Sequence, residues 1–170
     1  MNGKARAQWA DAFWTFSTTF YATPKVEATC LELQDRDGLE VNLVLFCLFA
    51  AQQHVRFERT SVQAMQNIGR VWGNEIVAPL RAVRRSLKVH EVGNEQVRIL
   101  RKEVKRVELE AEKAMQGALI DLFISLETCN EAESPAVIAA HNLATWFDEE
   151  GIDSKEPHAS VARLIQAAFG

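Results

Sequence analysis

The run from Val41 to Ala51 is apolar at every position except Asn42. Eleven residues are too few to cross a bilayer, which needs about 20. Leu, Phe, Cys and Ala outnumber β-branched residues, and helix-forming residues continue to Gln53, so the composition favours a helix over a strand. A helix that is apolar on every side must be surrounded by other helices. We therefore predict an all-α fold around a buried central helix from about Glu40 to His54.

Asn42 is the polar residue inside this run. A buried amide without hydrogen-bond partners costs about 1–3 kcal/mol. Two interpretations stay open. The amide bonds backbone or water in the first turn, or it faces a small-molecule pocket or fixes a neighbouring helix.

Apolar residues at helical spacing predict further helices on both sides of the central one. Aromatic residues from Trp9 to Phe20 share one face of the first helix, which indicates core packing more strongly than a base-stacking platform. Thr23-Pro24 and Ser134-Pro135 are typical helix starts, Thr60 or Ser61 can cap another, and Gly151 is a typical stop. With 170 residues, we expect one domain of about six or seven helices, with a core over about 4–128 and a C-terminal helical appendage over about 134–169.

Two long helices are predicted in the middle of the chain. The apolar pattern from Met65 to Leu87 passes through Pro79, so we expect one rod that is kinked there. The next helix, from about Asn94 to Glu127, carries a heptad seam from Val97 to Ala118. That seam needs a partner, which is either the preceding rod in a long antiparallel hairpin or a second copy in a homodimer.

Basic residues concentrate near the tip of this predicted hairpin. Between Arg81 and Arg106, nine basic and three acidic residues give a net charge of +6, in a chain whose net charge is −4. Neighbouring like charges on a helix are destabilising by a few tenths of a kcal/mol per pair, so the cluster needs compensation. The candidate anion-binding or partner-binding residues are Arg81, Arg84, Arg85, Lys88, Arg98, Arg101, Lys102 and Lys105.

Two interpretations of the basic cluster stay open. It contacts an anionic partner, such as nucleic acid, a phosphorylated small molecule or an acidic protein. Alternatively, it pairs within the protein with acids such as Glu27, Glu32, Asp35 and Asp37. The first interpretation predicts a non-enzymatic binding or adaptor protein. A second hypothesis is a small-molecule-binding protein or enzyme with a pocket near Gln34, Asp35, Asn42, Trp72 and Arg81, and a third is a structural homodimer through the heptad seam.

Known catalytic and metal-binding motifs do not explain the sequence. The four histidines stand far apart, and there is no glycine-rich phosphate loop or nucleophile elbow. Glu108 and Glu112 share a helix face, where an acidic pair is usually solvated. The segment from Asp35 to Gly38 lacks the later ligands of a calcium loop. We expect no metal and no cofactor, and we favour a binding protein over an enzyme.

The expected location is the cytoplasm, with no membrane partner. The first residues show no apolar stretch of signal-peptide length. Cys30, Cys47 and Cys129 form an odd set without a Cys-x-x-Cys motif, and we interpret them as small buried hydrophobes in a reducing compartment.

Two motifs carry a resemblance to known proteins. One is Cys-Leu-x-Leu-Gln-Asp-x-x-Gly-x-x-Val-Asn-Leu from Cys30 to Leu43, and the other is Pro-Leu-Arg-x-x-Arg-Arg-x-Leu-Lys from Pro79 to Lys88. Together with their surroundings, from Trp9 to Met115, they are similar to a bacterial family of short helical proteins catalogued only as a conserved domain of unknown function. Glu40 stands where that pattern has Asp, and Gly73 where it has Arg. The resemblance implies a bacterial cytoplasmic helical protein and no particular activity.

Overall fold

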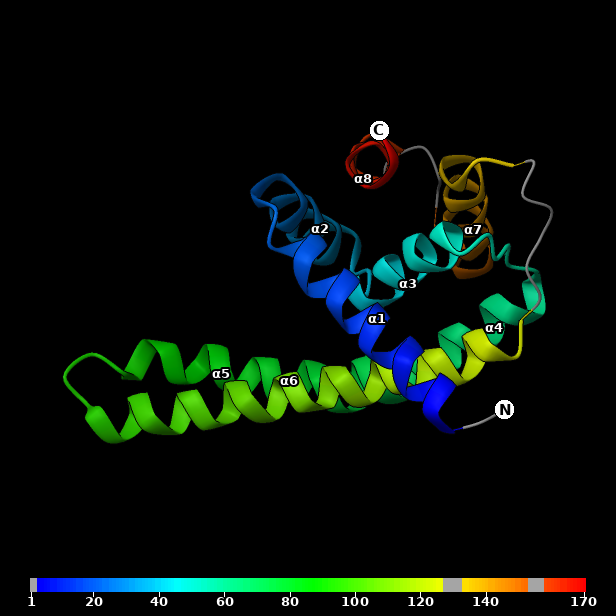
Figure 1. Cartoon of the computed structure of the whole chain (residues 1–170). Coiled ribbons are helices and arrows are strands. Elements are labelled where there is room, and N and C mark those ends of the chain that lie inside the picture. Colours follow the sequence, from blue (N-terminus) through cyan, green and yellow to red (C-terminus); the bar gives the residue numbers. More distant parts are fainter. Residues whose placement is uncertain (1–2, 127–132, 153–157) are drawn as a thin grey trace.

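The computed structural model describes residues 3–126, 133–152 and 158–170. Within these residues the protein is all-α, without strands, so the predicted single-domain helical fold is confirmed (Figure 1). The elements are α1 (Gly3–Tyr21), α2 (Pro24–Asp37), α3 (Val41–Gln52), α4 (Arg59–Ile68), the π-helix η1 (Gly69–Val77), α5 (Ala78–His90), α6 (Glu95–Ile124), α7 (Pro135–Glu150) and α8 (His158–Phe169). Since α4, η1 and α5 are continuous, the described residues form seven helical rods.

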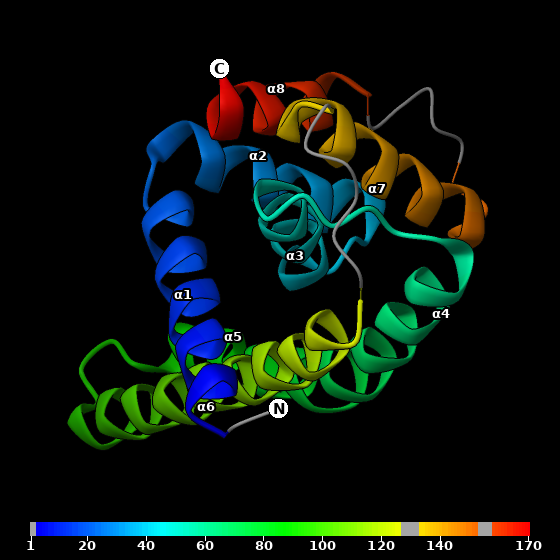
Figure 2. The same ribbon diagram turned by 45° about the vertical axis from the view of Figure 1, so that its right-hand side comes forward.

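Helix α3 is the centre of the core, and all residues from Val41 to Ala51 are buried. Figure 2 shows α3 enclosed by the other helices. The aromatic face of α1 packs on it, with the ring centroids of Trp9, Phe13 and Phe16 lying 6.3, 4.9 and 5.7 Å from that of Phe49. These aromatic residues therefore form the core and are not a base-stacking surface.

Several helix ends follow from local chemistry. Gly38 and Gly151 end α2 and α7 in the left-handed conformation, with φ of 67° and 66°, which glycine adopts without steric cost. Ser134 caps α7 by accepting a hydrogen bond from the backbone N–H of Val137 at 3.4 Å. The prediction that Thr60 or Ser61 caps the rod is wrong, because the helix begins at Arg59 after Glu58.

The rod of α4, η1 and α5 is continuous through Pro79, as predicted, and its irregular part lies just before the proline. In η1 the backbone widens, and Ala78 N–H donates to the carbonyl oxygen of Gly73, five residues earlier. Pro79 has no N–H, and its ring would collide with a carbonyl one turn back in a regular helix, so a widened turn accommodates it.

Two glycines of η1 allow the rod to approach α3 closely. A Cβ atom on Gly69 would lie 2.7 Å from Cδ1 of Leu43, and one on Gly73 would lie 3.1 Å from Oε2 of Glu40. The fold thus places Gly73 and Glu40 side by side.

Helices α5 and α6 form the long antiparallel hairpin, which projects from the body in Figure 1. Its tip turns at Gly93, with φ of 73°. The hairpin covers only part of the heptad seam, because Leu100 and Val107 remain 51% and 43% exposed.

The C-terminal helices pack on this body. Helix α7 lies against α3 and adds Ile138, Leu143 and Trp146 to the same hydrophobic core. Its buried Asn142 accepts from the backbone N–H of Phe57 at 2.8 Å. Helix α7 is thus part of the core packing, a closer association than the word appendage implies. None of the helices in the described residues is long and apolar enough to cross a membrane.

Candidate functional site

A cavity of about 270 Å³ lies where the base of the hairpin meets α1, α2 and α3; we call it the hairpin-base cavity. Each helix contributes residues at spacings of three or four, which share one helix face. Its apolar and aromatic lining comprises Trp14, Tyr21, Leu31, Val41, Leu45 and Leu109. Its charged and amide lining comprises Gln34, Asn42, Arg81, Arg84, Arg85, Glu108, Glu112 and Gln116.

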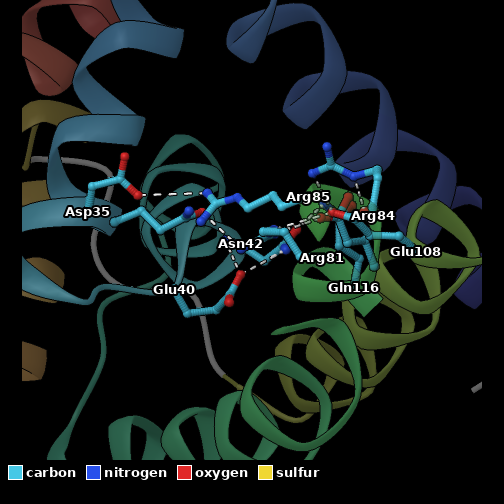
Figure 3. A network of polar contacts seen from close by, with 10 residues as sticks. Asp35, Glu40, Asn42, Arg81, Arg84, Arg85, Glu108 and Gln116 are labelled. Carbon is cyan, nitrogen blue, oxygen red and sulfur yellow. Dashed lines mark hydrogen bonds and ion pairs between the residues drawn. The ribbon is translucent and has the colours of Figure 1, made fainter. Parts of the chain in front are cut away.

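An ion-pair network joins the two helices of the hairpin at the cavity wall (Figure 3). Glu108, only 5% exposed, accepts from Arg81 Nε at 3.2 Å, from Arg84 Nη2 at 3.2 Å and from Arg84 Nε. The hydrogen bonds to Glu108 raise the pKa of Arg84. One buried carboxylate thus holds two arginines in place.

Arg81 extends the network to α2 and to a second carboxylate on α6. Its Nη1 donates to Oε1 of Gln34 at 2.9 Å, and its Nη2 donates to Oε1 of Glu112 at 3.0 Å. Burial disfavours the charge of Arg81, but the attraction of Glu40 and Glu112 and its hydrogen bonds outweigh that effect and raise its pKa. Burial raises the pKa of Glu112, against the attraction of Arg81.

A chain of amides leads from Glu40 into the cavity wall. The Oε1 atom of Glu40 accepts from Asn42 Nδ2 at 3.0 Å, and Asn42 Oδ1 accepts from Gln116 Nε2 at 2.9 Å. A carboxylate only accepts, so it fixes the orientation of Asn42, which in turn fixes that of Gln116. The remaining oxygen, Oε1 of Gln116, is buried without a hydrogen-bond partner among the described residues.

Ser17 provides a second unpaired polar atom in the same wall. Its Oγ atom is buried and has no hydrogen-bond partner in the described part of the chain. Ser17 and Gln116 are each 4% exposed, and both line the hairpin-base cavity. The nearby phenol of Tyr21 also lines it, and burial raises the pKa of that phenol.

The structure brings together most of the pocket residues predicted from the sequence. Gln34, Asn42 and Arg81 line one cavity, and Asp35 lies within 3.8 Å of Arg85. Trp72 is not part of the lining and packs, partly buried, against the core.

The arginines of the predicted basic set have partners within the protein. Besides the pairs at the cavity, Arg98 meets Glu95 at 2.6 Å and Arg101 meets Glu91 at 3.0 Å. Lys88, Lys102 and Lys105 have no ion pair among the residues described. These three exposed lysines are the unpaired remainder of the set.

Among the acids predicted as internal partners, Asp35 pairs with Arg85, whereas Glu32 pairs with Arg36 and Arg163. The side chain of Asp37 lies outside the described part of the chain.

Sequence reasoning missed four residues of this site. Glu108 and Glu112 were expected to be solvated, but antiparallel pairing sets them opposite Arg84 and Arg81. The helical spacing of the two acids and of the two arginines was visible in the sequence, but their pairing depends on the register of the hairpin. Ser17 and Gln116 carried no signal, because their importance comes from what the fold leaves unbonded.

Metal-ligand and thiol chemistry give no second site in the described residues. No group of three His, Cys, Asp or Glu side chains there could hold a metal ion. Cys30 and Cys47 are buried, and burial raises the pKa of the Cys30 thiol to about 12 and raises that of Cys47 as well. Cys129 lies outside the described residues.

Comparison with known proteins identifies a family. Residues 12–119 match the model of a family described as "Protein of unknown function (DUF2390)". No curated protein and no solved structure matches the chain. The resemblance to a domain of unknown function is therefore confirmed over most of its expected range.

Proposed function

This chain belongs to the DUF2390 family, and since that family brings no activity with it, we propose from the geometry that the protein binds a small organic molecule in the hairpin-base cavity. The matched residues 12–119 include every residue of the cavity lining.

The unpaired polar atoms of Ser17 and Gln116 are the observation that carries the proposal. A buried polar group without a partner costs about 1–3 kcal/mol, so native proteins rarely keep one without reason. Here two such atoms belong to side chains that line one cavity. A bound molecule that forms hydrogen bonds with both would remove this cost.

The surrounding network favours binding over chemistry. Arg81 and Arg84 both donate to Glu108, and Arg81 also bonds Gln34, so these side chains set the shape of the wall. Apolar residues on the other walls suit the body of an organic ligand, as in most small-molecule sites. Binding there would also join the hairpin to the body, because the lining comes from both.

The experiment compares two tryptophan substitutions on α6. Leu109 lines the cavity and is 40% exposed, whereas Val107 is 43% exposed and lies outside the lining. A small-molecule fragment library is screened by ligand-observed NMR against the wild type, Leu109→Trp and Val107→Trp. We expect hits that Leu109→Trp abolishes and Val107→Trp retains. Absence of hits, or equal loss in both variants, would refute a cavity site.

A second candidate function is partner binding at the hairpin tip. Lys88, Lys102 and Lys105 are exposed there, and Val89 and Val92 are 77% and 90% exposed. Exposed apolar residues beside unpaired cations suit an anionic partner, either nucleic acid or an acidic protein.

The test for this candidate is titration of labelled RNA and DNA at two salt concentrations. Binding should weaken steeply with salt and disappear when the three lysines become Glu. Absence of binding at low salt would exclude nucleic acid as the partner.

A further inference from the structure

We infer that the ligand of the hairpin-base cavity is a small organic anion with a hydrogen-bond donor at its buried end. This inference rests on the proposed function and adds the chemistry of the ligand. It follows from the polar groups at the buried and exposed ends of the cavity and from its volume.

The buried end requires a donor. Because Glu40 fixes Asn42 and Asn42 fixes Gln116, the unpaired group of Gln116 is its carbonyl oxygen. An amide oxygen accepts hydrogen bonds and cannot give one. The hydroxyl of Ser17 can donate or accept, so it adapts to the same ligand group. An amine or a hydroxyl on the ligand satisfies both.

The exposed end favours a negative charge. Arg84 bonds Glu108 through Nε and Nη2, and its Nη1 takes part in no hydrogen bond among the described residues. Arg85 is exposed and lies 3.8 Å from Asp35, a loose pair that leaves most of its donors available. Two guanidinium groups with unused N–H donors form a suitable site for a carboxylate.

The volume limits the size of the ligand. A cavity of about 150 Å³ in another protein holds benzene, so the 270 Å³ here corresponds to about ten non-hydrogen atoms. The aromatic side chains of Trp14 and Tyr21 in the wall suit a flat body. An aromatic carboxylate with a donor on the opposite side of the ring has this size and polarity.

The experiment uses three probes of equal size, measured by isothermal titration calorimetry. 4-Aminobenzoate has the donor and the charge, 4-methylbenzoate lacks the donor, and 4-aminobenzamide lacks the charge. We expect 4-aminobenzoate to bind about tenfold tighter than either of the others, as one hydrogen bond or ion contact provides.

Substitutions assign each preference to an end of the cavity. Gln116→Met should reduce the ratio of the affinities for 4-aminobenzoate and 4-methylbenzoate to about one. Ser17→Ala should lower the same ratio without disturbing the packing of the helices. Arg85→Gln should reduce the preference for carboxylate over amide, whereas Arg106→Gln, on an exposed arginine outside the lining, should leave it unchanged.

Equal affinities for the three probes would overturn the inferred ligand class and leave cavity binding in place. Failure of 4-aminobenzoate to bind would also overturn the class. The fragment screen with Leu109→Trp and Val107→Trp then decides separately whether the cavity binds molecules of another kind.

Discussion

Replacing Glu108 with Gln should destabilise the protein strongly, because that carboxylate holds two arginines. Removing one partner of a buried ion pair costs about 3–5 kcal/mol. Here Arg84 is partly exposed and Arg81 keeps its bonds to Gln34 and Glu112, so we expect the low end, about 3 kcal/mol. In a domain of this size that loss lowers Tm by roughly 6–12 °C.

The measurement is urea denaturation followed by circular dichroism, with thermal unfolding in parallel. Glu110→Gln is the matched control, because among the described residues that exposed carboxylate on the same helix pairs only with Lys113, at 3.8 Å. A surface pair of this kind contributes at most about 1 kcal/mol. If Glu108→Gln lost no more stability than Glu110→Gln, the network would not be holding the two helices of the hairpin together.

Three further predictions concern other parts of the structure. Burial raises the pKa of Glu112 above its ordinary value of 4.5, so the native state binds this proton more tightly than the unfolded state. The contribution of this group to stability therefore falls as the pH rises above 4.5. Glu112→Gln should flatten that fall in unfolding experiments from pH 4.5 to 7. Gly117→Ala should stabilise the protein by up to about 1 kcal/mol, since the new Cβ would lie 3.6 Å from the end of the Arg6 side chain. Gly69→Ala should destabilise it, since the new Cβ would lie 2.7 Å from Cδ1 of the buried Leu43. The midpoints of urea denaturation compare the two variants. The exposed residues Leu100 and Val107 of the heptad seam predict a homodimer, which sedimentation velocity should detect in the wild type and not in the variant with Lys at both positions; a monomeric wild type would contradict this prediction.

The parts of the fold that could be predicted are those in which local chemistry and burial agree. The Val41–Ala51 run was apolar on every side, and only a central position hides such a helix. Pro24 and Gly151 marked helix ends because their backbone preferences act without tertiary context. The π-helix from Gly69 to Val77 was not predicted, since its wider turns arise from packing against α3 together with the following proline.

The candidate site was predicted in part. Asn42 and Arg81 stood out because a lone amide in an apolar run and a basic residue at helical spacing both need partners. The pairing of Glu108 with Arg84 required the hairpin register, which side-chain spacing along one helix cannot supply. The unpaired state of Ser17 and Gln116 depends on the arrangement of five helices, so no pattern along the chain could show it.

The contact between Glu40 and Gly73 affects how the cavity wall presents its amides. The carboxylate of Glu40 lies over Gly73 and is available to Asn42. An arginine substituted at position 73 would compete for that carboxylate and release the Asn42 amide to turn over. Gln116 would then turn with it and present its NH₂ group in place of its oxygen. The residue at position 73 would therefore decide which hydrogen-bonding group Gln116 presents in the cavity wall.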